Sequence, residues 1–165
     1  MLAFAQLSST FAVTAPLVTA DQFLAAASRG FRTVINFRPD REVANQVESC
    51  EMARHAAAAG LHYLHVPAEK HAIFEDDLID ATIQALSAAR GPVLATCASG
   101  RRAAILWGIV GVGSRTVDDV LADYIRAGFD FRCLREEFEE QAARGRNGAP
   151  TFSDQDDEAP EREAA

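Results

Sequence analysis

Short apolar runs alternate with amphipathic helical stretches along most of the chain. Four of these runs are typical of strands, because they are brief, rich in apolar or β-branched residues, and bounded by glycine or proline: 11–14, 32–37, 61–66 and 92–96. Strands that are separated by helices are joined by right-handed crossovers and run parallel. We therefore predict a three-layer α/β fold in which helices flank a mainly parallel central sheet.

The helical stretches carry start signals and apolar faces of their own. Thr19, with Gln22 three residues later, forms a capping-box pattern at the first of them. The expected inward faces consist of Phe23, Leu24 and Ala27; Val43, Val47, Cys50, Ala53 and Ala57; Ile79, Ile83 and Leu86; Val117, Val120, Leu121, Tyr124 and Ile125; and Phe131, Leu134, Phe138 and Ala142. This pattern places Cys50 in the core, and we expect the same of Trp107 in the apolar helix over 105–112.

Length and composition indicate one domain with its own core, because 48% of the 165 residues are hydrophobic. We place this domain at residues 1–146. The acidic remainder, 147–165, is predicted to be a disordered tail, because 153–161 lack large apolar side chains. We expect this tail to keep the chain soluble, and the alternative is that it binds a partner.

Charge and cysteine content limit the partners and the compartment. The formal net charge of −8 argues against nucleic acid or an anionic membrane as the main partner. No apolar run approaches the roughly 20 residues that a membrane-spanning helix needs. Three cysteines form no disulfide framework and suit a reducing compartment, so we expect a cytoplasmic protein. The four histidines show no metal-ligand spacing, and we expect neither a metal nor a cofactor.

A cysteine follows the fourth expected strand directly, in the run Thr96-Cys97-Ala98-Ser99-Gly100-Arg101-Arg102-Ala103. The positive end of the helix that follows would favour a thiolate at Cys97, the form that acts as a nucleophile. Backbone N–H groups from Ala98, Ser99, Gly100 and Arg101 can curl into an anion-binding nest, since Gly100 has no side chain to hinder it. An arginine adds a bidentate donor for the oxygens of the anion. We therefore predict a nucleophilic Cys97 in an anion-binding loop; a buried structural cysteine is the alternative.

The loops after the parallel strands should meet at one edge of the sheet. Three of them carry polar residues, 36–40, 67–71 and 97–102, and we expect them to form one cleft. If the bound anion is a phosphoryl group, its leaving oxygen needs a general acid, and Asp40 at a strand end is the first candidate, with a turn role as its alternative. Further acid candidates lie near the second loop: Glu69, His71, Glu75 and Asp76. We expect Arg38 at the surface, with a contact to the anion as its alternative, and Arg101 pointing outward.

Three segments resemble a bacterial phosphatase-like family, DUF442. Residues 30–40 with Glu42 and Gln46 resemble its "GF-TVINLRPD-E---Q" segment, and residues 97–102 with Leu106-Trp107 resemble its "C-SG-R---LW" segment. Residues 121–129, which end in Ala-Gly-Phe, resemble its "A---AGYD" segment. This family is the phosphatase-like domain of beta-lactamase hydrolase-like proteins and is also described as a sulfurtransferase family. The resemblance covers roughly residues 10–140.

The resemblance implies a fold like that of dual-specificity protein tyrosine phosphatases. It also implies that Cys97 attacks a phosphate ester to form a phosphocysteine, while Arg102 clamps the phosphate.

Departures from phosphatases leave three functions open. Phosphatases place five residues between cysteine and arginine, whereas this loop has four, as in rhodaneses. Thr96 and Ala103 stand where phosphatases usually have histidine and Ser or Thr, and Ala98 replaces an arginine that is common in the family. The leading hypothesis is a cysteine-dependent phosphatase-like hydrolase that acts on a small phosphorylated substrate. The alternatives are a rhodanese-like sulfurtransferase, with a Cys97 persulfide and a sulfur-containing substrate, and a weakly active module that binds anions or phosphoproteins.

Overall fold

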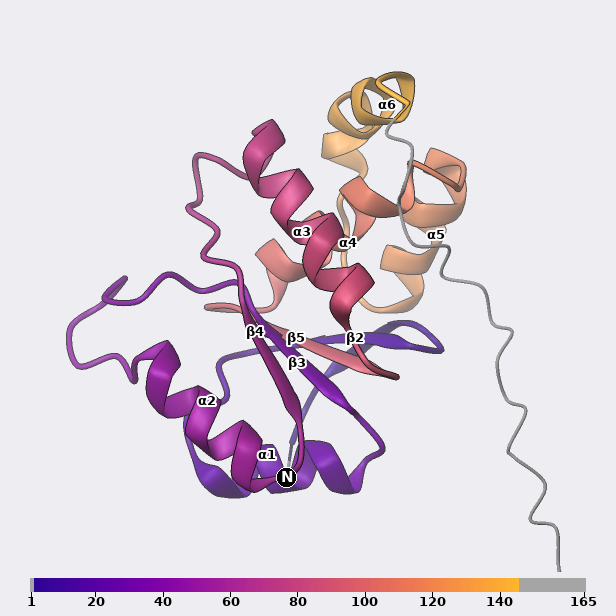
Figure 1. Cartoon of the computed structure of the whole chain (residues 1–165). Coiled ribbons are helices and arrows are strands. Elements are labelled where there is room, and N and C mark those ends of the chain that lie inside the picture. Colours follow the sequence, from indigo (N-terminus) through magenta and orange to yellow (C-terminus); the bar gives the residue numbers. More distant parts are fainter. Residues whose placement is uncertain (1, 146–165) are drawn as a thin grey trace, which may run out of the picture.

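The computed structural model describes residues 2–145 of the chain. Its centre is a five-stranded sheet in the order β1-β2-β5-β3-β4 (Figure 1). The strands are β1 (Ala5–Ser8), β2 (Phe11–Thr14), β3 (Thr33–Asn36), β4 (His62–His65) and β5 (Val93–Thr96). All neighbouring strands are parallel except β1, which pairs antiparallel with β2 at one edge. The mainly parallel sheet is therefore confirmed, with one edge strand that the sequence pattern did not indicate.

Helices cover both faces of the sheet. They are α1 (Ala20–Ser28), α2 (Ser49–Ala58), α3 (Asp76–Ala88), α4 (Arg101–Gly111), α5 (Val117–Arg126) and α6 (Arg135–Ala143), with a short 3-10 helix η1 (Arg132–Leu134) before α6. The helices α1 and α2 lie on one side of the sheet, and α3 to α6 lie on the other (Figure 1). The predicted three-layer arrangement is confirmed.

Alternating strand residues feed two separate apolar cores. In β3, Val34 packs into the core beneath α1 and α2, whereas its neighbour Ile35 packs into the larger core beneath α3 to α6. The same alternation occurs in β5, where Leu94 and Ala95 enter opposite cores. Both faces of the central strands are buried, which is why apolar residues follow one another without alternation in Val34-Ile35 and Val93-Leu94-Ala95. Trp107 is fully buried in the larger core, as expected.

The start of α1 agrees with its sequence signal, and its inner face agrees only in part. Thr19 and Gln22 form the reciprocal capping box. Phe23 is buried together with Ala26, but Leu24 is 51% exposed, so the prediction for Leu24 was wrong. Its neighbour in the sequence, Phe23, occupies the face that meets the sheet.

The predicted apolar face of the second helix was also wrong. The helix α2 begins only at Ser49, so Val43 and Val47 lie in the preceding loop, and Val43 is 52% exposed. With this start, Met52 and Ala56 face the core, and Cys50 is exposed rather than buried. In the fifth helix, Ile125 is likewise exposed.

Two further expectations concern the ends and the membrane. The predicted tail at 147–165 and the domain boundary at 146 lie outside the described residues. Within residues 2–145, no helix has the length and apolar character required to span a bilayer.

Candidate active site

The loop between β5 and α4 turns sharply around a buried cysteine. Cys97 follows the last residue of β5 and has no exposed surface. Gly100 is the N-terminal cap of α4 and adopts the left-handed conformation, with φ of 81°. A Cβ atom at this position would also lie 3.4 Å from the carbonyl oxygen of Thr14. Glycine is therefore the residue that suits this turn, both for its backbone angle and for its closeness to β2.

The backbone N–H groups of the loop have no partner within the described chain. Among residues 2–145, no carbonyl or side chain accepts a hydrogen bond from the N–H groups of residues 98–102. The first bond of the helix is donated by the N–H group of Ala104 to the carbonyl of Gly100, at 3.0 Å. A row of N–H groups at the positive end of a helix forms a site that can bind an anion.

Arg102 joins the three loops at this edge of the sheet. The residue is 6% exposed, and its Nη1 donates to the carbonyl oxygen of Ala68 at 2.6 Å. Its Nη2 donates to Glu42 Oε1, also at 2.6 Å. These two bonds connect the loop after β5 to the loops after β3 and β4. The expected convergence of the three loops is therefore confirmed.

Glu42 binds a second arginine in addition to Arg102. Its Oε2 accepts a hydrogen bond from Arg38 Nε at 2.8 Å. Burial by itself raises the pKa of Glu42, but the bond from Arg38 and the nearby charge of Arg102 outweigh it and lower the pKa below its usual value. The side chain of Arg38 is only 13% exposed, so the expectation that it lies at the surface was wrong. An arginine whose aliphatic part is covered and whose guanidinium is paired can be buried.

The structure assigns Asp40 a local structural contact. Its Oδ1 accepts a hydrogen bond from the backbone N–H of Ser49 at 2.7 Å, and its Oδ2 accepts one from the Ser49 hydroxyl at 2.6 Å. Burial by itself raises the pKa of Asp40, but the two hydrogen bonds from Ser49 outweigh this effect, and the pKa lies below its ordinary value. The carboxylate thereby caps the start of α2.

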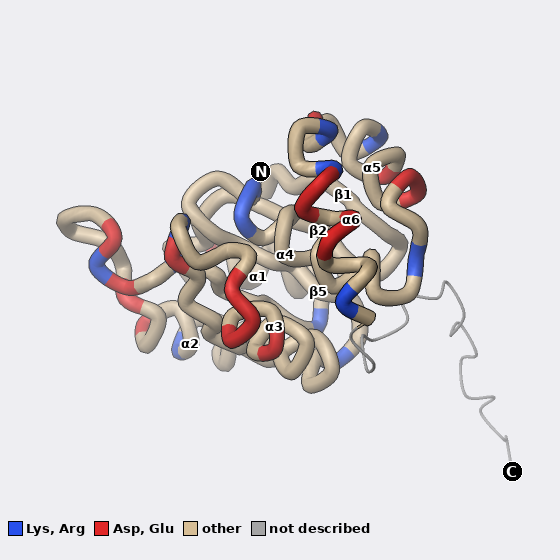
Figure 2. Tube along the Cα trace, turned by 90° about the horizontal axis from the view of Figure 1, so that it is seen from above, with Lys and Arg blue, Asp and Glu red and all other residues tan. Residues whose placement is uncertain are grey.

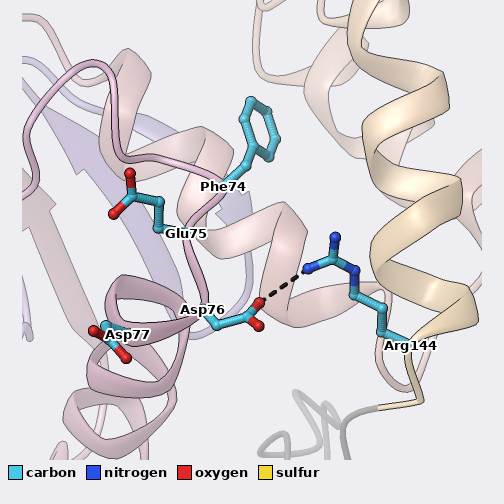
Figure 3. A pocket seen from close by; sticks show the side chains of 5 residues that line it. All are labelled: Phe74, Glu75, Asp76, Asp77 and Arg144. Carbon is cyan, nitrogen blue, oxygen red and sulfur yellow. Dashed lines mark hydrogen bonds and ion pairs between the residues drawn. The ribbon is translucent and has the colours of Figure 1, made fainter.

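The other acid candidates fall into two groups. Glu69 and His71 are exposed, and Glu69 directly follows Ala68, whose carbonyl holds Arg102. Glu75 and Asp76 instead line a hollow of about 370 Å³ with Phe74, Asp77 and Arg144 (Figure 3). In this hollow Asp76 pairs with Arg144 at 3.0 Å. Acidic residues also gather on α3 and α6 in Figure 2. Three carboxylates against one guanidinium would repel a phosphate, so this hollow does not suit a phosphorylated substrate.

The residues that border the loop are fixed by packing. Thr96 is buried, and its hydroxyl donates to the carbonyl of Ala15 at 2.9 Å. Ala103 is fully buried against the larger core. Arg101 is exposed, as expected, and its guanidinium lies over the ring of Phe131 at 5.0 Å. Neither border residue therefore offers a free hydroxyl to the loop.

Metal-ligand geometry is missing from this part of the chain. The residues that the structure describes contain no group of three His, Cys, Asp or Glu side chains that could hold a metal ion. The cysteines other than Cys97, namely Cys50 and Cys133, are exposed and free.

Sequence reasoning missed the partners of Arg102. Glu42 stood out only within the family-like segment, and the carbonyl of Ala68 has no sequence signature. A local signal did exist, because Glu42 follows Arg38 by four residues, as in a common ion-pair spacing. The pair with Arg102, however, joins residues 60 positions apart and becomes visible only in the fold.

The chain shares sequence and fold with phosphatase-like proteins. It is 39% identical over 112 residues to a beta-lactamase hydrolase-like protein of Xylella fastidiosa; the match covers 67% of this chain and 26% of the Xylella protein. The chain thus spans about a quarter of the length of this relative. The solved structure of a "putative phosphatase" of Neisseria meningitidis is 26% identical with a TM-score of 0.72, over 83% of this chain and 96% of the other. The solved structure of a DUF442 "putative phosphatase" of Shewanella putrefaciens is 15% identical with a TM-score of 0.62. This match covers 87% of this chain and 88% of the other.

These similarities agree with the geometry of the chain. The structural neighbours are phosphatases with a fold like that of protein tyrosine phosphatases, as expected. Residues 3–114 match the family described as the phosphatase-like domain of beta-lactamase hydrolase-like proteins, and they include β2 to β5 and the cysteine loop. The chain therefore belongs to the family of the beta-lactamase hydrolase-like phosphatase-like domain.

Proposed function

We propose that the chain is a cysteine-dependent phosphatase that hydrolyses phosphate esters. The observation that carries the proposal is the loop itself: a row of N–H groups that have no partner within residues 2–145 precedes α4, between the buried Cys97 and the fixed Arg102. The N–H groups suit the non-bridging oxygens of a phosphoryl group. Family membership and the phosphatase neighbours support the same reaction class.

The reaction runs in two balanced steps. The thiolate of Cys97 attacks phosphorus in line, an S–P bond forms, and the P–O bond to the leaving alcohol breaks. The leaving oxygen takes up a proton and departs as the alcohol. Water then attacks phosphorus, the S–P bond breaks, and inorganic phosphate leaves with the thiolate restored. The loop N–H groups stabilise the charge on the equatorial oxygens in both steps.

Arg102 serves as the clamp in this proposal. Two of its donors are bound to Ala68 and Glu42, which fixes the plane of the guanidinium and leaves further N–H groups for a phosphate oxygen. Preorganisation of this kind lowers the cost of holding the arginine in place when the substrate binds. Glu42 is then a positioning residue, since it acts through Arg102.

Glu69 is the better acid candidate in the proposed reaction. A general acid must be protonated and free to face the leaving oxygen. Asp40 has both carboxylate oxygens bound to Ser49 and a lowered pKa, which favours a structural role in capping α2. Glu69 is exposed and lies next to the residue that holds Arg102.

Sulfur transfer is the second candidate function, because four residues separate Cys97 from Arg102, as in rhodaneses, and Asp40 is bound to Ser49 rather than free to act as an acid. In this reaction the Cys97 thiolate attacks the outer sulfur of thiosulfate, an S–S bond forms, and sulfite leaves. The resulting persulfide passes its outer sulfur to an acceptor such as cyanide, which restores the thiolate. No proton has to be delivered to sulfite.

Two assays on the same protein separate these functions. The hydrolysis of an aryl phosphate and the transfer of sulfur from thiosulfate to cyanide are measured for the wild type and for Cys97→Ser, with Cys50→Ser as the matched control at an exposed cysteine. The phosphatase proposal expects aryl phosphate turnover that Cys97→Ser abolishes and Cys50→Ser retains. Sulfur transfer with the same dependence on Cys97, and no hydrolysis, would support the second function instead.

If neither activity appears, but phosphate raises the melting temperature of the wild type, the chain is an anion-binding module and the phosphatase proposal fails. Equal hydrolysis rates for the wild type and Cys97→Ser would also overturn it.

A further inference from the structure

The exposed arginine that follows the cysteine loop has no acidic partner within residues 2–145. Arg101 is the first residue of α4, and its guanidinium lies over the ring of Phe131, 5.0 Å from the ring centre. Among residues 2–145, no carboxylate pairs with it. A guanidinium that stacks on an aromatic ring keeps the N–H groups at its edge available for hydrogen bonds.

Other arginines in the same region are already committed to carboxylates. Arg38 and Arg102 share Glu42, Arg126 pairs with Asp123, and Arg132 pairs with Asp130. Within residues 2–145, Arg101 differs from these four arginines in having an aromatic platform rather than a counter-ion.

The platform under Arg101 is rigid. Phe131 is 2% exposed, stacks on Phe129 with ring centres 5.4 Å apart, and meets the edge of Tyr124 at 4.8 Å. Tyr124 is itself fixed by a hydrogen bond to the carbonyl of Ala104 at 2.7 Å. An arginine that rests on a fixed ring loses less conformational freedom when it binds a ligand. The arrangement thus holds in place the guanidinium of Arg101, the first residue of the helix after the loop, before any substrate arrives.

We propose that the side chain of Arg101 binds a second anionic group of the substrate, so that the preferred substrates carry two phosphates. This inference rests on the proposed phosphatase function for the first phosphate, which occupies the loop between Cys97 and Arg102. The second phosphate lies outside the loop, where two N–H groups at the edge of the Arg101 guanidinium donate to two of its oxygens as a bidentate pair. The site thereby selects small bisphosphorylated compounds over those with a single phosphate.

The test compares kcat/KM for phenyl phosphate with kcat/KM for the three phenylene bisphosphates, in which the phosphates are ortho, meta or para to each other. The wild type prefers at least one bisphosphate, and Arg101→Ala lowers the ratio of bisphosphate to monophosphate by about 5- to 10-fold, the scale of one charge-assisted hydrogen-bonding group at an exposed site. Arg101→Lys, which keeps the charge and loses the planar fork, gives a ratio between the two. The preference of the wild type also falls with added salt, because the second phosphate is bound at the exposed rim.

Arg29 provides the matched control. It is an exposed arginine that lies over a phenylalanine ring as well, 5.3 Å from the centre of Phe4, but it ends α1 on the opposite side of the sheet. Arg29→Ala is expected to keep the ratio of the wild type. A ratio that Arg101→Ala leaves unchanged for all three bisphosphates would overturn the proposal, as would an equal fall of the ratio in Arg29→Ala.

A binding measurement distinguishes this failure from a failure of the phosphatase function. Pyrophosphate and orthophosphate are titrated calorimetrically into Cys97→Ser and into Cys97→Ser with Arg101→Ala. A tighter affinity for pyrophosphate that Arg101→Ala removes supports the second anion site even if no turnover is found. If phenyl phosphate is turned over but the ratio of bisphosphate to monophosphate kcat/KM does not depend on Arg101, the phosphatase function stands and the second site is rejected.

Discussion

Replacement of Glu42 by glutamine tests whether the arginine clamp depends on this carboxylate. Glutamine keeps the shape of the side chain but removes the charge that faces Arg102 at 2.6 Å and Arg38 at 2.8 Å. Two unit charges 2.6 Å apart attract each other by roughly 6 kcal/mol at an effective dielectric constant of about 20. Desolvation of the two groups, whose side chains are 7% and 15% exposed, offsets most of this attraction. We expect Glu42→Gln to lower the free energy of unfolding by about 2 kcal/mol.

The measurement is urea unfolding at neutral pH, followed by a double-mutant cycle with Arg102→Met. The coupling energy between the two positions is expected to be about 1–3 kcal/mol. Glu51→Gln is the control, because Glu51 is 55% exposed and pairs with His55 at 3.8 Å, so that its loss changes the stability by less than about 0.5 kcal/mol. A coupling energy below about 0.5 kcal/mol would refute the reasoning.

The same variant has a defined pH signature. The folded-state pKa of Glu42 is lowered, so its contribution to stability is fully present above pH 4.5, the unfolded value, and is lost as the pH falls through the lower folded pKa. The difference in stability between the wild type and Glu42→Gln should therefore shrink below pH 4.5. A difference that stays constant down to strongly acidic pH would mean that the ion pair is not its source. With phenyl phosphate, kcat/KM of Glu42→Gln is expected to fall by about tenfold, because Arg102 loses a fixed orientation.

Three further variants test the packing and the local contacts. Gly108→Ala places a Cβ 1.9 Å from the hydroxyl oxygen of Tyr124 and is expected to destabilise the fold by about 2–4 kcal/mol in urea unfolding. Gly111→Ala in the same helix, where the nearest atom to the new Cβ is 3.6 Å away, should be neutral or stabilising. Equal effects of the two substitutions would contradict this view of α4. Asp40→Asn should cost about 1 kcal/mol through the weakened cap of α2. The alkaline limb of the pH-rate profile, where a general acid loses its proton, should stay in place, and loss of this limb would return Asp40 to the role of general acid. Asp123→Ala leaves Arg115, which lies over Trp107, without its carboxylate partner and is expected to lower the free energy of unfolding by about 2–4 kcal/mol. Arg126→Ala, which removes the exposed partner of Asp123, should lower it by less than about 0.5 kcal/mol. A stability of Asp123→Ala equal to that of the wild type would refute the importance of this buried carboxylate.

The central sheet could be predicted because its strands are buried on both faces. Residues of β3 and β5 are all buried, so their apolar residues are adjacent in the sequence, as in Val34-Ile35 and Val93-Leu94-Ala95, and stand out from their surroundings. The edge strand β1 has only Leu7 buried, and its pairing depends on β2 rather than on its own pattern. An edge strand of this kind has no periodic signal from which to identify it.

The phase of α2 could not be predicted because a distant contact sets its start. Asp40 binds the backbone and the hydroxyl of Ser49, nine positions later, and this places the first turn of the helix. The apolar pattern that starts at Val43 and Val47 includes residues of the loop before α2. Extending this pattern into the helix led to the wrong assignment of Cys50 to the core. The carboxylate that was considered for catalysis was thus also the reason for the error in the helix.

The cysteine loop could be located from the sequence because its parts are contiguous. A strand, a cysteine, a glycine and the start of an apolar helix all fall within residues 93–105, so no long-range contact is needed to recognise them. The environment of Arg102 could not be found in this way, because its two partners belong to loops 34 and 60 positions away. The burial of Arg38 depends on the same carboxylate and was missed for the same reason.

The most direct test of the account is to trap the covalent intermediate on Cys97. The wild type is mixed with an aryl phosphate, quenched within milliseconds, digested, and its peptides are examined by mass spectrometry under conditions that preserve the S–P bond. The account predicts one phosphoryl group on the peptide that contains Cys97, none on those that contain Cys50 or Cys133, and none in Cys97→Ser. Turnover of the substrate with the phosphoryl group on another residue, or unchanged turnover by Cys97→Ser, would contradict the claim that Cys97 is the nucleophile.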